Sequence, residues 1–471
     1  MKKNLTLTIL IILLFSCSTE ENNENEELTD SFIYFENGTC KCPNSSVGFS
    51  QTISDTLYTV VDNSSIRDEI SKGNINLCTT LVTNMSRLFA VDGSINSINE
   101  FKKSFNQDIN FWDTSSVTNM ELMFFGSESF NSPLNNWDVS NVKNMNMMFR
   151  SSISFNQDIS QWDVSNVTNM GGMFSGDWTV DYESISGSSM FEGVVERKTI
   201  FNHDISNWDV SNVTDMMGMF HNNKKFNQPI GEWNVSNVIT MAFMFAGDFD
   251  QINGPRGNVI NPFNQDISQW DVSNVKNMSY MFLISDFNQD ISNWDVSNVI
   301  TMNGIFSQSP FNKSIENWNV SNVILMDKMF FFSDFNQDIS NWDVSNVTDM
   351  SFMFSNSKFN HPIGNWNVSN VTKMDGMLEW NKYFNQPIGN WNVSNVESME
   401  NMFMESDLFN QEIGNWDVSK VTKMGKMFAG ADSFNQDLSS WCVSNIMSEP
   451  IFFSIDSSLE SVNKPIWGTC P

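Results

Sequence analysis

Few side chains in this sequence are of the types that carry out acid–base or metal chemistry. The 471 residues include only three histidines, His203, His221 and His361. His203 and His361 occupy the same place in a repeated motif, where most copies have Gln, so they would lie too far apart to share a metal ion. The sequence also lacks a Gly-x-Ser-x-Gly nucleophile motif, a phosphate-binding glycine loop and a His-Glu-x-x-His zinc motif. We therefore predict that the protein is not an enzyme, and we assign no catalytic, cofactor-binding or metal-binding residue.

Carboxylates offer a second kind of chemistry, because Asp or Glu recurs at two fixed places in the motif, exemplified by Asp338 and Asp343. Several carboxylate oxygens together could bind Ca²⁺. However, five residues of extended chain would separate the two places by ~17 Å. No cofactor is therefore expected, although Ca²⁺ bridging between successive copies, for example between Asp266 and Asp290, stays open. A glycoside hydrolase needs one acid of raised pKa in an enclosing cleft, whereas the motif repeats the same Asp in copy after copy.

These residues belong to a unit that occurs thirteen times, with the clearest copy at Phe335–Phe354 (FNQDISNWDVSNVTDMSFMF). The tryptophan of the unit recurs mostly every 24 or 25 residues between Trp112 and Trp441. Two longer steps place insertions near residues 176–200 and 248–262. A fixed period of this length predicts a solenoid, in which each copy contacts mainly its neighbours.

Within the unit, the apolar spacing changes from that of a strand to that of a helix. Residues 342–344 alternate between apolar and polar, as in a short strand with one buried face, whereas the apolar residues of 347–354 are spaced as on a two-turn helix. We therefore predict an α/β solenoid of short parallel strands and short helices, with an all-β solenoid as the alternative. The residues expected in its core are Trp342, Val344, Val347, Met350, Met353 and Phe354.

The repeat array, predicted over residues 78–447, needs its ends covered. Residues 31–77 and 448–471 lack the repeat and are expected to form an N-terminal and a C-terminal cap. The cysteines other than Cys17 cluster at these two ends: Cys40, Cys42, Cys78, Cys442 and Cys470. Because an exported protein meets an oxidising compartment, we predict a Cys442–Cys470 disulfide and a second one that joins Cys78 to Cys40 or Cys42.

The first thirty residues are predicted to direct export. Lys2 and Lys3 precede an apolar run at 5–15 that is too short to span a bilayer, as in a secretory signal peptide. The run ends in Leu-Phe-Ser-Cys, which resembles the acylation site of bacterial lipoproteins, although an ordinary signal peptide with an incidental Cys17 is the alternative. We expect a signal peptide at 1–16, a lipid on Cys17 and a flexible acidic tether at 17–30.

The repeated unit Phe-Asn-Gln-Asp-Ile-Ser-x-Trp-Asp-Val-Ser-Asn-Val-Thr-x-Met resembles the repeat of bacterial surface proteins, including BspA-like leucine-rich-repeat lipoproteins and domains of unknown function. The resemblance extends over most of the mature chain, from about residue 78 onward. It implies a leucine-rich-repeat-like right-handed solenoid, a location at the outer membrane or cell surface, and a role in adhesion. It implies no reaction. This chain has Phe, Trp, Val and Met where conventional leucine-rich repeats have Leu.

The charge of the chain limits its partners. Asp and Glu number 55 against 25 Lys and Arg, which gives a formal net charge of −30. Such a field repels phosphate backbones and excludes nucleic acid. The expected partners are the membrane, through the lipid anchor, and an extracellular protein or glycan. We favour a binding or adhesion scaffold. The alternatives are a surface hydrolase or enzyme accessory with its site in the 176–200 insertion, and a structural spacer.

Overall fold

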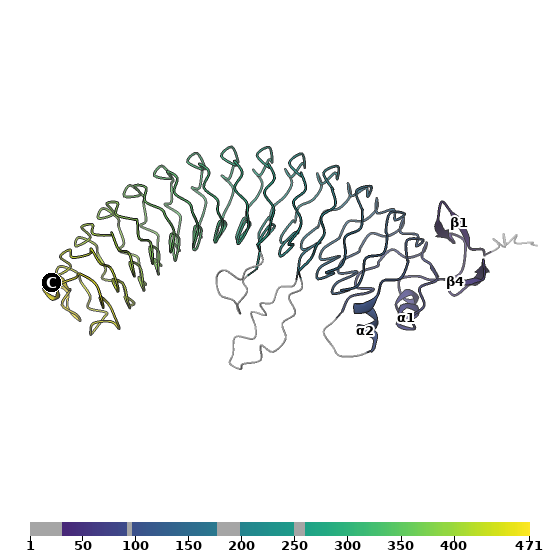
Figure 1. Cartoon of the computed structure of the whole chain (residues 1–471), viewed down its shortest axis with the longest axis horizontal. Helices are drawn as coiled ribbons and strands as arrows, with labels where there is room; N and C mark the ends of the chain where they lie inside the picture. The colour runs from purple at the N-terminus through teal and green to yellow at the C-terminus, as the bar shows by residue number, and fades with distance from the viewer. Residues whose placement is uncertain (1–30, 92–96, 177–197, 249–259) are drawn as a thin grey trace, which may run out of the picture.

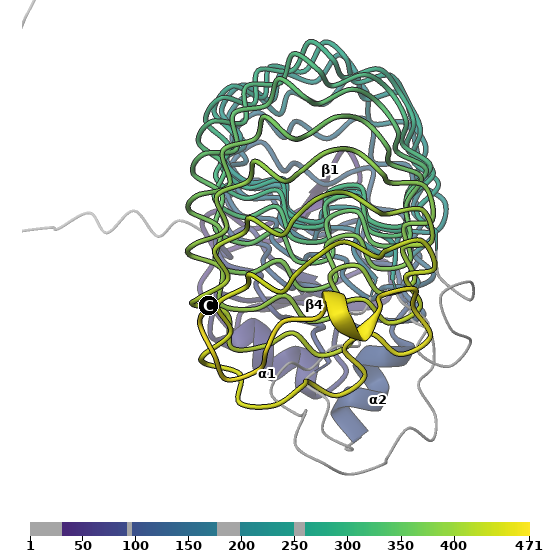
Figure 2. The same ribbon diagram turned by 90° about the vertical axis from the view of Figure 1, so that its left-hand side faces the viewer.

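The computed structural model describes residues 31–91, 97–176, 198–248 and 260–471. From the first coil to the C-terminal end, the chain forms coils that stack side by side into an arc (Figure 1). In the view along the arc, the coils overlie one another as flattened rings (Figure 2). The segment predicted as an N-terminal cap lies at one end of the arc and the C-terminus lies at the other (Figure 1).

Short strands build the N-terminal end. Strands β1 (Tyr34–Glu36) and β2 (Thr39–Lys41) form an antiparallel hairpin. Strands β3 (Ser50–Ile53) and β4 (Thr56–Val60) form a second one, and β5 (Leu77–Cys78) adds to β4 in parallel. The run of strand-forming residues around Tyr58 thus lies in β4, at the centre of the three-stranded sheet.

Two helices lie beside the first coils. Helix α1 (Ser65–Ser71) buries Ile66 and Ile70 in the main core, and helix α2 (Ser97–Ser104) packs Phe101 against it. Arg67 of α1 donates a 2.8 Å hydrogen bond to the carbonyl oxygen of Ser86 in the first coil. This bond satisfies an acceptor on the edge of the first coil, which has no coil before it.

Each repeat unit contributes a single residue to a long ladder of parallel bridges. Asp349 pairs with Leu325 in the preceding coil and with Lys373 in the following one, and the ladder runs from Asn84 to Lys423. Residues 342–344 are extended but form no strand, so the pairing lies a few residues later than the sequence predicts.

The helix predicted over residues 347–354 is absent; a bridge and a series of turns replace it. The reason is the direction of the hydrogen bonds. The backbone N–H groups of Met350, Phe352 and Phe354 donate to carbonyl oxygens of the next coil at 2.8–3.1 Å, rather than to residues four positions earlier. Phe352 also has a left-handed backbone (φ 57°), which interrupts a right-handed helix. The three-residue apolar spacing therefore comes from a turn.

All six residues predicted as core are buried, with at most 4% of each side chain exposed. Their equivalents in the other coils join one continuous hydrophobic cluster that runs the length of the array. Phenylalanine rings stack on one another from coil to coil, as Phe330 does on Phe354 with 5.8 Å between ring centroids. The core is therefore built of aligned side-chain columns.

The spacing of these columns explains the curvature of the arc. Ring centroids in successive coils are 5.4–6.0 Å apart in the column of Phe330 and 6.3–6.5 Å apart in the column of Trp342. Coils that lie closer together on one side must bend toward it. The side of Phe330, which follows the bridge ladder, is therefore the inner side of the arc.

Residues 448–471 continue the stack rather than forming a separate unit. The N–H groups of Phe428 and Gly430 donate at 2.8 Å to the carbonyl oxygens of Phe453 and Ile455. A short 3₁₀ helix, η2 (Ser461–Asn463), follows. The last segment thus reproduces the inner side of a coil without the repeat motif.

Candidate functional site

The polar side chains that recur in every copy of the motif form hydrogen bonds to a neighbouring coil. The indole Nε1–H of Trp342 donates a 3.2 Å hydrogen bond to the carbonyl oxygen of Ile315 in the preceding coil. The same bond recurs at all thirteen tryptophans of the motif. The tryptophan column is thus core, with its single polar atom satisfied.

The asparagines of the motif form two further ladders. The side-chain oxygen of Asn336 accepts the backbone N–H of Asn360 at 3.0 Å, and the side-chain nitrogen of Asn346 donates to the Ser321 carbonyl oxygen at 2.7 Å. His203 and His361, in the place of the motif's Gln, contact the carbonyl oxygens of Asn156 and Asn336 at 2.9 and 3.1 Å, respectively. Gln side chains make the same contact, so these histidines fill a structural place.

The third histidine has a different environment. His221 lies two residues before Asn223, in the inner-side segment of its coil, and is 6% exposed. Burial and, to a smaller extent, the nearby Arg150 together lower its pKa to about 3, so the imidazole is neutral at physiological pH. A group with this pKa cannot serve as a general base or acid near neutral pH.

The two columns of acidic residues close turns. One carboxylate oxygen of Asp338 accepts the N–H of Ser340 at 2.9 Å, and one of Asp343 accepts the N–H of Ser345 at 3.0 Å. Hydrogen bonds from these serines hold the pKa of both carboxyl groups below its usual value. Where the motif has Asn instead, Asn319 makes the same turn with Ser321. No three His, Cys, Asp or Glu side chains gather around one point in the part of the chain that the structure describes.

A close backbone approach explains why Gly replaces the motif's Ser in some copies. A Cβ atom on Gly364 would lie 2.3 Å from the carbonyl oxygen of Pro387, and one on Gly389 would lie 2.3 Å from that of Glu412. These contacts are too short for any side chain. The replacement of Ser by Gly in these copies thus reflects backbone packing between coils, and no ligand is needed to explain it.

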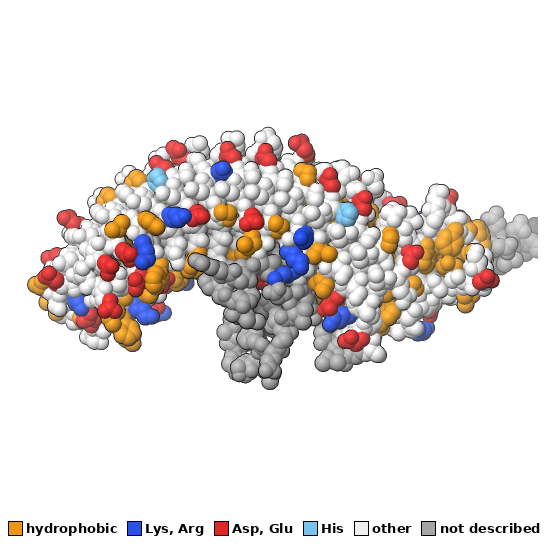
Figure 3. Space-filling view, viewed as in Figure 1, with side chains coloured by type: hydrophobic (Ala, Val, Ile, Leu, Met, Phe, Trp, Pro, Cys, Tyr) orange, Lys and Arg blue, Asp and Glu red, His pale blue; other side chains and the backbone are white. Residues whose placement is uncertain are grey.

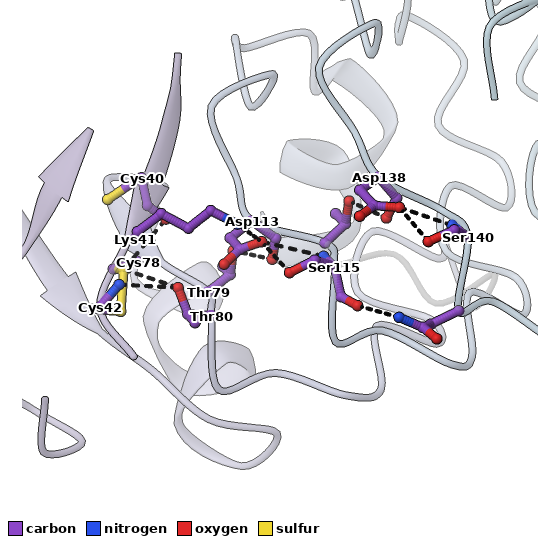
Figure 4. A network of polar contacts seen from close by, with 12 residues as sticks. Cys40, Lys41, Cys42, Cys78, Thr79, Thr80, Asp113, Ser115, Asp138 and Ser140 are labelled. Atoms are coloured by element: carbon purple, nitrogen blue, oxygen red, sulfur yellow. Dashed lines mark hydrogen bonds and ion pairs between the residues drawn. A yellow bond between two sulfur atoms is a disulfide. The ribbon is translucent and has the colours of Figure 1, made fainter. Parts of the chain in front are cut away.

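Asp113, the first member of its column, is an exception, because only 1% of it is exposed (Figure 4). Burial by itself raises the pKa of this carboxyl group, but hydrogen bonds from Lys41, Ser115 and Thr80 lower it below the usual value. The ion pair with Lys41, at 2.9 Å, ties strand β2 to the second coil. Asp113 is therefore the polar junction between the cap and the array.

The cysteines settle the pairing that the sequence left open. The structure contains the predicted Cys442–Cys470 disulfide and joins Cys78 to Cys42. Cys40 is free and buried, and burial raises the pKa of its thiol to about 12, so it stays protonated and unreactive. Cys17 lies outside the described residues, as do most of both insertions.

Two shallow pockets lie next to acidic side chains of the motif. One, of about 320 Å³, lies beside His203, and the other, of about 370 Å³, lies beside Glu412. Asp158 lines the first pocket, and hydrogen bonds from Ser160 lower the pKa of its carboxyl group. This carboxylate stays ionised at neutral pH, so it lacks the proton that a general acid must donate.

The inner side of each coil carries the most variable residues of the unit. Two positions per coil have a left-handed backbone there: Lys328 and Phe332, then Phe352 and Asn356, then Gly376 and Trp380 in three successive coils. We call the columns formed by these positions and the residues next to them the variable face. Its members differ from coil to coil in size and charge, whereas the buried columns hardly change.

Exposed aromatic rings concentrate on one stretch of the variable face. Phe332 and Trp380 are each 40% exposed, and Asn356 occupies the same column between them. The Phe331 and Phe332 rings lie 4.5 Å apart, and the Lys382 ammonium lies 5.9 Å from the Trp380 ring. We call Phe332, Asn356 and Trp380 the aromatic ridge. These two exposed rings make this stretch a candidate for contact with another molecule.

Two acidic side chains of the variable face have raised pKa values. Burial raises the pKa of Asp327, as does the nearby Asp349. Burial also raises the pKa of Glu379, although Lys426 partly opposes this shift. The coil that contains Phe352 separates the two carboxyl groups. They are therefore two separate desolvated acids rather than a facing pair.

The sequence prediction did not find the variable face, although the sequence contains a signal for it. At two places in the array, an aromatic side chain at the first left-handed position is followed, one coil later, by Gly. A Cβ on Gly304 would lie 2.4 Å from the Tyr280 ring, and one on Gly376 would lie 2.4 Å from the Phe352 ring. These pairs, 24 residues apart, mark rings that lie flat on the next coil.

Comparison with known proteins identifies the repeat. No curated protein and no solved structure matches this chain. In the described part of the chain, no helix is both long and apolar enough to cross a membrane. The model of a single family matches four times in tandem, over residues 56–186, 177–259, 283–383 and 355–464. Because these matches include most of the sequence, the chain belongs to the DUF285 family, whose description is "Mycoplasma protein of unknown function".

Proposed function

We propose that this protein is a lipid-anchored bacterial cell-surface repeat protein, which binds an extracellular protein or glycan with its variable face and catalyses no reaction. The proposal includes a leucine-rich-repeat-like solenoid of the BspA type, with Cys17 as the acylated residue. The four tandem matches to the DUF285 family support a surface location, as does the N-terminal segment, which resembles a secretory signal peptide.

The observation that supports binding is the contrast between constant and variable columns. Trp and Asn recur at the same places because their side chains hydrogen-bond to a neighbouring coil, as Trp342 and Asn336 do. Phe recurs because its rings stack from coil to coil, and Asp because it closes a turn within its own coil. The side chains of the variable face do not have to make such contacts between coils. Even so, Phe332 and Trp380 on this face have exposed aromatic rings and a left-handed backbone. Half-exposed aromatic side chains with few freely rotating bonds are typical of interaction sites.

The test is an array of extracellular proteins and glycans, probed with the full chain and two variants. In Phe332→Ser/Trp380→Ser, the rings of the aromatic ridge are removed. In Ile239→Ser/Ile300→Ser, two exposed apolar residues outside the ridge are replaced. We expect the first variant alone to lose at least about tenfold in affinity, equivalent to ~1.4 kcal/mol. Equal binding by all three proteins would contradict the proposal.

The same array separates the alternatives. A spacer would bind nothing in either form. A hydrolase with a site in the 176–200 insertion would release products from an arrayed glycan, and a variant lacking residues 177–197 would abolish that release. Cys17→Ala tests the anchor, because loss of the lipid should move the protein from the detergent phase to the aqueous phase in phase partition.

A further inference from the structure

The N-terminal end has an apolar surface for which the array gives no explanation. Phe35 of strand β1, Tyr58 of β4 and Phe111 form a cluster of three rings with centroids 5.3, 5.7 and 6.2 Å apart. Phe35 is 40% exposed, and the other two are partly exposed. We call these three residues the aromatic triad. The space-filling view shows a broad hydrophobic area at this end of the molecule (Figure 3).

Main-chain bonds hold the triad in place. The N–H of Cys40 in β2 donates a 2.8 Å hydrogen bond to the carbonyl oxygen of Phe111, which fixes the β1–β2 hairpin against the first coils. The Cys42–Cys78 disulfide and the Lys41–Asp113 ion pair hold the same hairpin from the other side. The rings therefore form a rigid surface and lose little further freedom on binding.

The charge distribution indicates what this surface meets. Although the chain carries a net charge of −30, residues 31–61 contain only three charged side chains, Glu36, Lys41 and Asp55. Lys41 is already paired with the buried Asp113. A surface with so few charges costs little to bring against lipid headgroups, whereas the acidic coils would be repelled by anionic ones.

The position of the triad in the chain selects the membrane over other apolar partners. Residues 17–30 connect the expected lipid on Cys17 to the start of the described fold, and fourteen residues span at most ~50 Å. Aromatic side chains with a polar group, such as Tyr58, are enriched where the hydrocarbon of a bilayer meets water. We propose that the aromatic triad is a membrane-contacting surface that lies in the interfacial layer of the bilayer to which Cys17 anchors the chain. This inference rests on the lipid anchor of the proposed function.

A matched pair of tryptophan variants tests the contact. Phe35 and Phe332 are both 40% exposed, so Phe35→Trp and Phe332→Trp each add one reporter of equal exposure, at the triad and on the variable face. The acylated full chain is attached to phosphatidylcholine vesicles with or without bromine atoms on the upper part of the acyl chains. Subtracting the fluorescence of the parent protein removes the signal of its 16 tryptophans.

We expect bromine to quench the fluorescence added at position 35 by about twofold and to leave that at 332 unchanged, since interfacial side chains reach the headgroup–acyl boundary. Vesicle flotation is measured on the same samples. Protein that floats but shows equal fluorescence at position 35 in both lipids would overturn the membrane contact and leave the anchor intact. Protein that does not float would overturn both. Formation of the Cys42–Cys78 disulfide in each variant verifies that the cap has folded.

Discussion

At the scale of single residues, the repeated polar side chains of this protein serve the structure. Trp342 satisfies its indole N–H on Ile315, and Asn336 satisfies the backbone of Asn360. A buried polar group that loses its partner is costly, so every coil needs the same side chain at the same place. Such a requirement makes the motif easy to see in the sequence without indicating any chemistry.

Replacing Trp342 tests this structural role. We expect Trp342→Phe to destabilise its region by ~1–3 kcal/mol, because the ring is smaller and the Ile315 carbonyl oxygen keeps only one of its two donors, the N–H of Trp318. Trp342→Ala should cost ~3–5 kcal/mol through the cavity. Urea unfolding, with hydrogen exchange of the adjacent coils, measures both. Trp380→Ala is the control, because Trp380 is 40% exposed and should cost less than ~1 kcal/mol. A Trp342→Ala variant as stable as the parent would show that the column is not core.

The turn carboxylates predict how stability depends on pH. Hydrogen bonds from the Ser345 hydroxyl and N–H lower the pKa of Asp343 in the folded protein. The stabilisation is fully present above the unfolded pKa, ~3.9, and is lost as the pH falls through the lower folded value. Asp343→Asn introduces the residue that the motif has at Asn319. Its free energy of unfolding should be close to that of the parent protein at pH 7 and should fall less between about pH 5 and pH 2. Equal acid sensitivity of parent and variant, in urea titrations at each pH, would refute this.

At the scale of elements, the sequence predicted which residues of each coil are buried, but it did not predict the backbone conformation that buries them. The Trp, Val, Met and Phe positions of the core and the Cys442–Cys470 disulfide follow from period and composition. The helix predicted over 347–354 is wrong, because a three-residue apolar spacing fits both a helix and a turn with one left-handed residue. The deciding hydrogen bonds run to the next coil, 24 residues away, where a local pattern gives no information.

The surface for which we propose binding was harder to predict than the core, for a related reason. Phe332 and Trp380 lie outside the motif, and their neighbours across coils are far away in sequence. Their exposure depends on the curvature and on the left-handed backbone, and neither can be read from one unit. The pairing of Cys78 with Cys42, rather than with Cys40, likewise cannot be read from the sequence, because both cysteines are fully buried and lie only two residues apart.

A glycine substitution tests the packing of one coil on the next. Gly376 has φ 55°, and a Cβ there would lie 2.4 Å from the Phe352 ring. We expect Gly376→Ala to destabilise the protein by ~2–4 kcal/mol, from the left-handed backbone and the overpacking together. In Phe352→Ala/Gly376→Ala, the overpacking disappears and part of the loss should return. Thermal unfolding of the parent protein and the two variants measures this.

Gly425 supplies the matched control for that experiment. Its nearest neighbour would lie 3.5 Å from a Cβ, and its backbone is not left-handed. Gly425→Ala should therefore be neutral or slightly stabilising, by ~0.4–1 kcal/mol. If Gly376→Ala and Gly425→Ala had the same effect, the tight coil-to-coil contact at Phe352 would be ruled out.

At the scale of the whole molecule, the stacked coils place like charges in rows. Asp290 raises the pKa of Asp266 in the neighbouring coil, although hydrogen bonds from Ser268 have the larger effect and lower it. Salt screens repulsion between exposed charges. We expect NaCl to raise the melting temperature gradually, and Ca²⁺ at constant ionic strength to add nothing. A saturable rise with Ca²⁺ that disappears in Asp290→Asn would show a cation site in the acidic column.

The repetition of the same bonds at every step has a genetic consequence. Each coil joins its neighbours through the same Trp, Asn and bridge positions, so removing residues 343–366 as one block would join Trp342 to Asn367 and rebuild those bonds across the junction. Unequal recombination between near-identical repeats of the gene deletes or adds blocks of this kind. The length of the array can therefore change in whole-coil steps during evolution, while both ends of the fold stay the same.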